Sequence, residues 1–335
     1  MAENILIYAP NWLGDSVMSM PAVQAFRRHH SDCRLTILCR SALAPLWRMH
    51  RAVDEVVEFS GGLADTLRVV RWLKIENHDK AFIFPNSFRS ALIPTLAGIP
   101  ARIGARGHMR EWLLTSVVPP PSGDHQAHQA WEYLAIVGLS DKEVQLDPPR
   151  IEVSDAMVAQ SRERLSSVET HGGWIGLIPG AARGPSKRWP ATHYADLGRR
   201  LIKALRCRIL VFGTAEELQL CAQVTGAIGG GATNLAGATS LRELAALLRM
   251  CRLVVANDSG GMHLAVAVGA RVVAVFGATD PAKTGPVGAG HAVVAPENVK
   301  VSHKIKPRSR EAERLLYQIS PGRVAQVVLD LLTER

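Results

Sequence analysis

The stretch Leu253–Gly277, LVVANDSGGMHLAVAVGARVVAVFG, decides the fold class of this chain. Its apolar, β-branched run Leu253–Ala256 predicts a buried strand, which the turn formers Asn257–Gly261 end. The letters HLAVAV then have the residue spacing of a helix, and Arg271–Phe276 predicts a second buried strand. A strand, a tight loop, a helix and a strand in this order predict part of a parallel α/β sheet.

The loop in the middle of this stretch has the features of an anion site. Gly260 and Gly261 allow the backbone to approach a ligand closely. The N-terminus of the helix that follows favours negative charge, such as that of a phosphate or diphosphate. Asp258 and His263 flank the loop and could hold hydroxyl groups of the same ligand. A tight connection without any ligand is the alternative explanation of these glycines.

Length and composition indicate a globular protein of two domains. The chain has 335 residues, of which 47% are hydrophobic and 21% charged, as in folded domains. No run reaches the ~18 apolar residues of a transmembrane helix, and the N-terminus enters a strand without a basic leader. We therefore expect a cytoplasmic protein that at most lies on a membrane face. The five cysteines show no CxxC pairing, which indicates reduced thiols and no metal site.

The net charge of +9 favours an anionic partner. Nucleic acid, an acidic membrane surface and a phosphorylated substrate all have this character. Nucleic acid is the least favoured of the three, because the basic residues are dispersed, aromatic residues make up only 5%, and no zinc finger or RNP-like motif is present. We therefore expect no nucleic-acid partner.

Apolar runs and helical patterns alternate along the chain, which predicts two doubly wound parallel sheets. Residues His171–Gly173 read as a hinge between them. The predicted strands are Asn4–Ala9, Arg34–Cys39, Lys80–Phe84, Trp174–Ile178 and Arg208–Phe212, besides the two already named. The predicted helices are Ser16–His30, Leu63–Lys74, Ser87–Ala97, Gln126–Val137, Asp155–Ser167, Thr192–Leu205, Glu216–Ala222, Leu241–Met250 and Pro321–Leu332. Loops at the carboxyl ends of the strands would face a cleft between the halves.

The loop after the first strand places Asp15 at the mouth of a helix, next to Gly14. A carboxylate within hydrogen-bond reach of a substrate hydroxyl can act as a general base, and Trp12 would form a wall of that site. A helix-capping aspartate is the alternative interpretation.

Two further loops carry cations. The second half opens with PGAARGPSKRWP after its first strand, where Lys187 suits a phosphate and Arg188 could make a bidentate contact. A solvated basic loop is the alternative. The cluster PNSFRS at 85–90 and the later Arg102, Arg106 and Arg110 could meet acidic groups of an acceptor, or be scattered surface residues. The sequence has no DxD in the strand-end loops, no GxxxxGK[ST] phosphate loop and no GxSxG elbow. GxGxxG does not follow the first strand, which disfavours a dinucleotide dehydrogenase.

Four segments together resemble one known family. They are PNWLGDSVMSMPAV from Pro10, FPNSFRSALIPTLAGIPARIGARG from Phe84, PGAARGPSKRWP from Pro179 and VVANDSGGMHLAVAVGARVVAVFGATDP from Val254. In this order they resemble the bacterial lipopolysaccharide heptosyltransferases, which use ADP-heptose. The NSFRSALIP and GPSKRWP stretches favour the heptosyltransferase II group, and the resemblance extends to about Pro281.

The resemblance implies a GT-B fold, with two Rossmann-like doubly wound domains facing across a cleft. It assigns residues 1–165 to an acceptor-binding domain, 174–318 to an ADP-heptose-binding domain, and 319–335 to a C-terminal helix that could pack back on the N-terminal domain. It implies an enzyme that transfers heptose from ADP-L-glycero-β-D-manno-heptose to the first heptose of the inner core, heptosyl-Kdo₂-lipid A. The transfer would invert the anomeric centre and need no metal or other cofactor.

The resemblance also implies roles for individual residues. Asp15 would be the catalytic base, Lys187 would neutralise the leaving diphosphate, and Leu235–Thr239 would line the adenine. The implied donor-binding residues are Gly180, Ala181, Lys187, Arg188, Glu216 (on the ribose), Ala236, Gly237, Asp258 (on the heptose), Ser259, Gly260, Gly261, Met262 and His263. The implied acceptor-binding residues are Asn11, Trp12, Gly14, Asn86, Ser87, Arg89 and Arg106.

The implied partners are ADP-heptose and a lipid A-core acceptor, met by a monomer at the cytoplasmic face of the inner membrane. Two alternatives stay open. One is a heptosyltransferase of type I or III with a different acceptor, and the other is a non-catalytic nucleotide-sugar-binding GT-B module. The presence of both Asp15 and Lys187 argues against the module. The basic segment Lys300–Leu316 has no assigned role.

Overall fold

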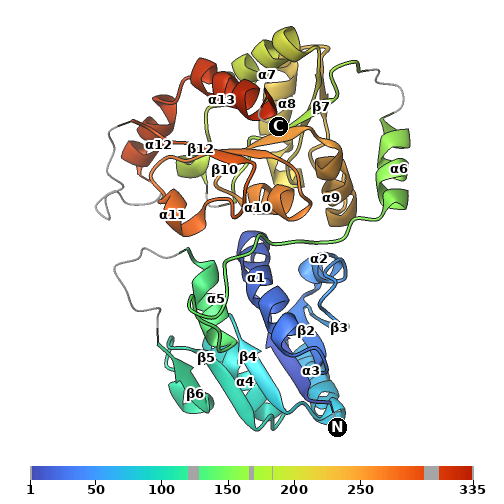
Figure 1. Ribbon diagram of the computed structural model, residues 1–335, viewed down its shortest axis with the longest axis vertical. Coiled ribbons are helices and arrows are strands. Elements are labelled where there is room, and N and C mark those ends of the chain that lie inside the picture. The colour runs from blue at the N-terminus through green and yellow to red at the C-terminus, as the bar shows by residue number, and fades with distance from the viewer. Residues whose placement is uncertain (1, 120–127, 166–169, 183, 298–308, 334–335) are drawn as a thin grey trace. The chain divides into compact units, whose positions relative to one another are not determined.

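The computed structural model describes residues 2–119, 128–165, 170–182, 184–297 and 309–333. The chain forms two compact units, Met1–Glu152 and Val153–Arg335 (Figure 1). Helix α6 (Asp155–Arg164) belongs to the second unit, whereas the family resemblance placed residues 1–165 in the first. The physical reason is packing: α6 contacts α9 (Leu241–Met250), and Arg249 of α9 bonds the carbonyl of Val153.

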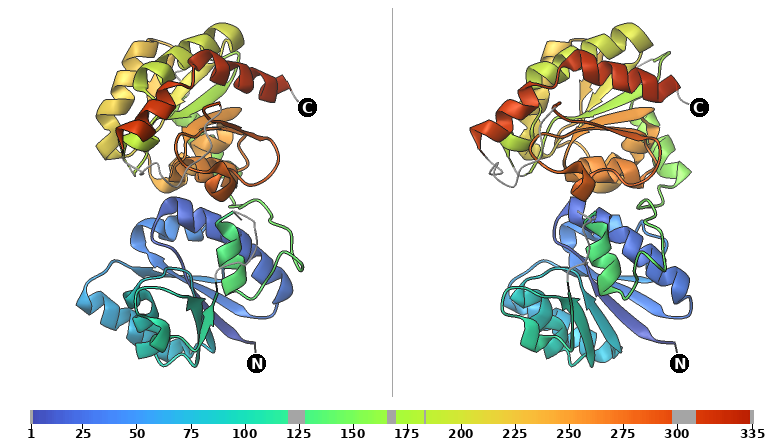
Figure 2. Two further views of the ribbon diagram at one scale, coloured as in Figure 1. Left: turned by 90° about the vertical axis from the view of Figure 1, so that its left-hand side faces the viewer. Right: turned by 60° about the vertical axis from the view of Figure 1, so that its left-hand side comes forward.

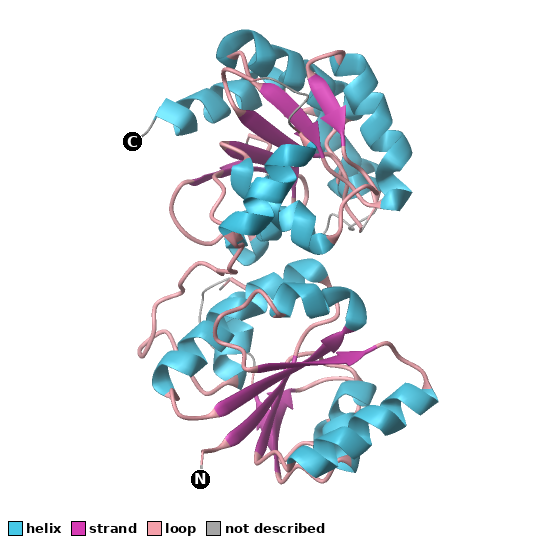
Figure 3. Ribbon diagram, turned by 90° about the vertical axis from the view of Figure 1, so that its right-hand side faces the viewer, coloured by secondary structure: helices cyan, strands magenta, loops and turns pink. Residues whose placement is uncertain are grey.

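The first unit is a parallel sheet with helices around it (Figure 3). Its strand order is β3-β2-β1-β4-β5-β6, and every neighbouring pair is parallel. The elements, in chain order, are β1 (Asn4–Tyr8), α1 (Leu13–His29), β2 (Arg34–Arg40), the 3₁₀ turn η1 (Ser41–Leu43), α2 (Ala44–Trp47), β3 (Glu55–Phe59), α3 (Leu63–Glu76), β4 (Lys80–Ile83), α4 (Phe88–Leu96), β5 (Ala101–Ala105), the 3₁₀ turn η2 (Glu111–Leu113), β6 (Ser116–Val118) and α5 (Ala130–Ile136).

The second unit repeats this plan. Its strand order is β12-β11-β10-β7-β8-β9, again parallel throughout. Besides α6 and α9 its elements, in chain order, are β7 (Trp174–Ile178), the 3₁₀ turn η3 (Pro185–Lys187), α7 (Ala191–Leu205), β8 (Arg208–Val211), the 3₁₀ turn η4 (Ala215–Glu217), α8 (Leu218–Ile228), β9 (Ala232–Asn234), β10 (Leu253–Asn257), α10 (Gly260–Ala267), β11 (Val272–Val275), α11 (Pro281–Thr284), β12 (His291–Val294), α12 (Arg310–Tyr317) and α13 (Pro321–Thr333).

Numbered within each unit, both sheets have the order 3-2-1-4-5-6 or its reverse. This is the Rossmann-like order, in which the chain direction across the sheet switches between strands 1 and 4. The central strands are buried on both faces, as parallel sheets covered by helices require. All five residues of β10 are buried, which explains why LVVAN reads as a nearly continuous apolar run.

The C-terminal helix α13 packs against α7 and β12 of its own unit (Figure 2). The family resemblance allowed this helix to pack back on the N-terminal domain. The structure instead buries its apolar face, including Val324 and Val328, in the core of the second unit. Part of the unassigned basic segment forms α12, and the residues from 298 to 308 lie outside the described part of the chain. Within the described ranges no helix has both the length and the apolar character that a membrane crossing needs.

Candidate active site

The loops singled out from the sequence follow the strands on either side of the switch point. In the first unit the Asp15 loop follows β1 and the 85–90 cluster follows β4, and β1 and β4 are neighbours. In the second unit the 179–190 loop follows β7 and the Asp258 loop follows β10, which are also neighbours. Ligands of open α/β sheets bind at this position, outside the carboxyl ends of the strands. The topology therefore pairs the predicted loops within each unit.

A buried ion pair joins the two loops of the second unit. The Nζ atom of Lys187 bonds the Oδ2 atom of Asp258, and the two side chains are only 12% and 7% exposed. Taking two charges out of water is costly unless they pair closely. The pair fixes Lys187, which stands in η3, beside the loop that precedes α10. Two residues predicted to meet different parts of one donor are thus held together before any ligand binds.

The N-terminus of α10 adjoins this pair. The first N–H groups of a helix have no partner within the helix, and the N-cap residue Ser259 makes no side-chain capping bond here. The Oγ atom of Ser259 is buried and has no hydrogen-bond partner among the described residues. A Cβ atom on Gly261 would lie 3.0 Å from Ile178, so the backbone is close-packed there. Unpaired donors at a helix N-terminus next to a lysine form a site suited to a diphosphate.

Asn257 holds the two loops in place, a role that its place among turn formers in the sequence did not indicate. Its fully buried carboxamide donates through Nδ2 to the carbonyl of Pro179 at 2.8 Å. Its Oδ1 atom accepts from the backbone N–H of Trp189 at 3.0 Å and lies 3.0 Å from the hydroxyl of Tyr194. One side chain at the end of β10 thereby bonds both ends of the loop that carries Lys187. A polar residue closing an apolar strand was the available signal.

Glu217 faces this loop. The role of the adjacent Glu216 as the ribose ligand stays a prediction. Glu216 is exposed, whereas Glu217 is buried and accepts from the N–H of Thr214 at 3.0 Å. A Cβ atom on Gly180 would lie 2.1 Å from the Glu217 carboxylate, which explains why glycine stands at that position. Arg188, predicted to clamp a phosphate, donates to the carbonyl of Ala181 at 3.1 Å and lies 3.9 Å from Glu217.

The other predicted donor residues lie in two places. Met262 and His263 are buried on α10. Ala236 and Gly237 stand in the loop after β9, where the N–H of Gly237 donates to the carbonyl of Gly213 at 3.0 Å. A Cβ on Gly237 would lie 3.1 Å from the Cα atom of Ala215, and its φ of +66° favours glycine. This contact sets the predicted adenine loop beside η4.

In the first unit Asp15 lies in the first turn of α1, which begins at Leu13 and not at the predicted Ser16. Trp12 is the N-cap residue, so Asp15 is not the cap that the alternative interpretation required. The Oδ1 atom of Asp15 accepts from Nε2 of Gln129 at 3.4 Å, and Gln129 also bonds the Tyr133 hydroxyl. Burial, and next the charge of Asp15, raise the pKa of Tyr133. Nothing in the sequence near Asp15 indicated Gln129.

The 85–90 cluster begins α4 with Ser87 as its N-cap, whose hydroxyl accepts from the N–H of Ser90. Asn86 and Arg89 are exposed, and so are Asn11 and Trp12 of the neighbouring loop. Arg106 is exposed and pairs with Glu111 at 3.2 Å.

Arg110 differs from these residues because it is fully buried. It bonds the carbonyls of Pro85 and Ala105, and burial lowers its pKa to about 10. Arg102 bonds the carbonyls of Ile99 and Leu113. These two arginines hold loops together instead of facing an acceptor.

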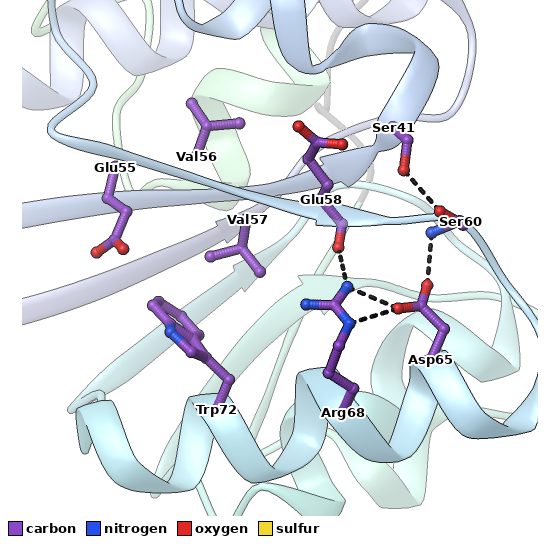
Figure 4. A pocket seen from close by; sticks show the side chains of 9 residues that line it. All are labelled: Ser41, Glu55, Val56, Val57, Glu58, Ser60, Asp65, Arg68 and Trp72. Atoms are coloured by element: carbon purple, nitrogen blue, oxygen red, sulfur yellow. Dashed lines mark hydrogen bonds and ion pairs between the residues drawn. The ribbon is translucent and has the colours of Figure 1, made fainter.

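A hollow of about 490 Å³ lies elsewhere in the first unit, between the edge strand β3 and helix α3 (Figure 4). Its polar groups bond one another: Arg68 bonds Asp65 and the carbonyl of Glu58, and Asp65 accepts from the N–H of Ser60. The sheet order puts β3 two strands from β1. None of the predicted site residues lines this hollow.

The five cysteines are buried and unpaired. Burial raises the pKa of Cys39 to about 12 and that of Cys207 to about 11. Such thiols stay protonated and serve as small core residues. Across the described residues no group of three or more His, Cys, Asp and Glu side chains is arranged to hold a metal ion.

Comparisons with known proteins agree with this architecture. The model of glycosyltransferase family 9 (heptosyltransferase) matches residues 66–313. Lipopolysaccharide heptosyltransferase 2 of Salmonella typhimurium is 29% identical over 98% of this chain and 99% of its own length. Lipooligosaccharide heptosyltransferase 2 of Haemophilus influenzae is 31% identical over 85% and 86%.

Among solved structures, that of the E. coli ADP-heptose lipopolysaccharide heptosyltransferase II superposes with a TM-score of 0.84. It is 28% identical and covers 98% of both chains. The two parallel sheets of this chain therefore form a GT-B fold. The chain belongs to glycosyltransferase family 9, the heptosyltransferases, and it is a glycosyltransferase of lipopolysaccharide biosynthesis.

Proposed function

We propose that this chain transfers heptose from ADP-L-glycero-β-D-manno-heptose to the first heptose of the lipopolysaccharide inner core. In this proposal the first unit binds the acceptor, the second binds the donor, the anomeric centre is inverted and no metal ion takes part. The observation that carries it is the buried Lys187–Asp258 pair beside the uncapped N-terminus of α10. The near full-length similarity to proteins named heptosyltransferase 2 supports the choice of acceptor.

The second unit would stabilise the departing ADP. As the bond between the anomeric carbon and the diphosphate breaks, negative charge grows on the diphosphate oxygens. Lys187 and the first N–H groups of α10 provide fixed positive charge for it, which is most effective where the groups are positioned in advance. Asp258 keeps Lys187 in place before the donor arrives. The buried Ser259 hydroxyl has no partner in the described part of the chain and offers the ligand one more hydrogen-bond donor.

The first unit would supply the base. Inversion requires an acceptor hydroxyl to attack the anomeric carbon on the face opposite the diphosphate. Asp15 would take the hydroxyl proton while the new C–O bond forms, so the proton ends on its carboxylate and the electron pair of the broken bond leaves with ADP. Its place in the first turn of α1 sets its side chain near the positive end of the helix dipole. Gln129 orients that carboxylate through its amide.

We further propose that the protein acts as a monomer at the cytoplasmic face of the inner membrane, because the acceptor is anchored in lipid. The basic charge of the chain suits an anionic membrane surface.

The decisive experiment measures ADP release and product mass with ADP-heptose and two acceptors in parallel. One acceptor is Kdo₂-lipid A, and the other is the same molecule carrying one heptose. We expect transfer only to the heptosylated acceptor. Transfer to bare Kdo₂-lipid A would instead identify a type I enzyme, and donor binding without transfer to either would leave the acceptor wrongly assigned.

Asp15→Asn tests the base separately, since asparagine keeps the shape but cannot accept the proton. We expect ADP binding close to that of the wild type and a loss of turnover of about 10²-fold or more. Asp32→Asn, which changes an exposed acid of the same unit, is the matched control and should retain full turnover. Near-normal turnover of Asp15→Asn would remove Asp15 from the mechanism.

A further inference from the structure

Three large apolar side chains of the first unit lie exposed around one pair of loops. Phe88 begins α4, and Met109 and Trp112 belong to the loop and 3₁₀ turn after β5. They are 39%, 87% and 72% exposed. The rings of Phe88 and Trp112 contact each other, with centroids 5.9 Å apart. Exposed single apolar residues are ordinary, but adjoining aromatic rings left in water indicate a surface that is covered in use.

Two arginines border these side chains. Arg89 follows Phe88 in α4 and is exposed. The Arg106 side chain, three residues before Met109, is 75% exposed and pairs with Glu111 at 3.2 Å. We call the set Phe88, Arg89, Arg106, Met109 and Trp112 the Trp112 surface. Tryptophan and phenylalanine with neighbouring arginines match the interface of an anionic bilayer, where rings enter the headgroup layer and the cations meet lipid phosphates.

The loops that carry this surface have a rigid base. Buried Arg110 bonds the carbonyl of Pro85 in one loop and that of Ala105 in the other, and it also bonds the Ser90 hydroxyl at 3.2 Å. Above it, His108 and Met109 both adopt left-handed backbone angles, with φ of 45° and 54°. Such angles are unfavourable for residues with side chains. Here they accompany the most exposed apolar side chain of the loop, that of Met109.

We propose that the Trp112 surface is where the protein binds the anionic face of a lipid bilayer, with Trp112 and Met109 as apolar anchors and Arg89 and Arg106 as headgroup contacts. The surface adjoins Asn86 and Ser87. The family resemblance assigns these two residues to the acceptor, as it does Arg89 and Arg106 of the surface itself. Docking there would bring a lipid-linked acceptor to the loops after β4. This proposal names the surface that would hold the protein at the membrane, and it rests on the proposed function only for the membrane location.

The test is sedimentation of the full chain with vesicles, in the absence of donor and acceptor. Vesicles of equal parts phosphatidylcholine and phosphatidylglycerol are compared with vesicles of phosphatidylcholine alone. We expect binding to the first that weakens with salt and is much weaker to the second. Trp112→Ser with Met109→Ser should weaken it roughly tenfold or more, because two anchors lose their burial in the interface. Arg89→Gln should reduce the preference for the anionic vesicles.

The matched control is Leu63→Ser with Ile75→Ser, which removes two apolar residues of α3 that are 77% and 80% exposed. It should bind vesicles like the wild type, and both double variants should keep the wild-type thermal midpoint because the changed side chains are exposed. Equal vesicle binding by wild type and the Trp112 double variant would overturn the proposal, as would equal losses in the two double variants. Loss of transfer to a delipidated, water-soluble acceptor with vesicle binding intact would instead make this surface part of the acceptor site. Because these vesicle assays contain no substrate, their failure leaves the transferase proposal standing.

Discussion

Replacing Asn257 by leucine should loosen the loop that carries Lys187, although Asn257 is assigned no contact with substrate. Leucine has a similar volume but makes none of the bonds of the carboxamide. The change leaves the carbonyl of Pro179 and the N–H of Trp189 buried without their partner. Each buried group that loses its partner costs about 1–3 kcal/mol. We therefore expect a loss of about 4 kcal/mol, a large part of the ~5–15 kcal/mol that stabilises an ordinary domain.

Urea unfolding followed by tryptophan fluorescence measures this loss, with Tyr194→Phe as the control. That variant removes one hydroxyl, while Oδ1 of Asn257 still accepts from Trp189, so we expect a loss of only about 1 kcal/mol. Hydrogen exchange at the Trp189 amide should accelerate in Asn257→Leu and stay slow in Tyr194→Phe. The KM for the donor should rise in the leucine variant, since Lys187 and Gly180 lose their support. Equal stability of the two variants would refute the role given to the carboxamide.

Substitutions at three buried positions test the packing and electrostatics of the structure. Gly180→Ala should lower the free energy of unfolding by about 1–3 kcal/mol, because the new methyl group meets the Glu217 carboxylate. Gly226→Ala, in open space on α8, should raise it by about 0.5–1 kcal/mol. Thermal unfolding compares the two variants, and equal effects would contradict the close packing at Gly180. Lys187→Met should lower the free energy of unfolding by about 3–5 kcal/mol, because it leaves Asp258 buried and unpaired. Adding Asp258→Asn should restore the urea midpoint but not heptose transfer. Recovered transfer in the double variant would contradict the role given to Lys187. Burial lowers the pKa of His50 from 6.5 to about 4, so the unfolded chain binds the proton more readily than the folded chain. The free energy of unfolding should therefore fall as the pH drops from about 6.5 to about 4, by about 3 kcal/mol over the whole range. In His50→Leu the urea midpoint should decline less steeply with falling pH than in the wild type. Parallel curves of midpoint against pH for the two proteins would exclude His50 as the source of the decline.

Seven inner strands could be predicted from the sequence, whereas the inner strand β5 and the edge strands could not. β1, β2, β4, β7, β8, β10 and β11 are apolar runs buried on both faces, and their composition alone indicates strands. β6 is SVV, β9 is ATN and β12 is HAVV, each three or four residues long and mostly exposed or half-exposed. Segments so short carry no periodicity. They are strands because a neighbour offers them backbone hydrogen bonds.

The residues of the site were only partly predictable for a similar reason. Gly180, Lys187 and Asp258 belong to loops whose composition already indicates an anion site. Glu216 and Glu217 are adjacent and chemically alike, and only the orientation of η4 decides which of them faces Gly180. Gln129 reaches Asp15 across 114 residues, and the Asn257 carboxamide reaches Pro179 across 78. Local patterns carry no information about such distant partners.

By itself the sequence determined the alternation of strands and helices and the chemistry of the loops that end the strands, because both depend on residues close together in the chain. The tertiary structure decided the strand order, which sets β1 beside β4 and β7 beside β10. It also assigned α6 and α13 to the second unit and paired Lys187 with Asp258. These outcomes depend on packing and hydrogen bonding between segments far apart in the sequence, where the free energy of burial selects one arrangement from the many that the local pattern allows.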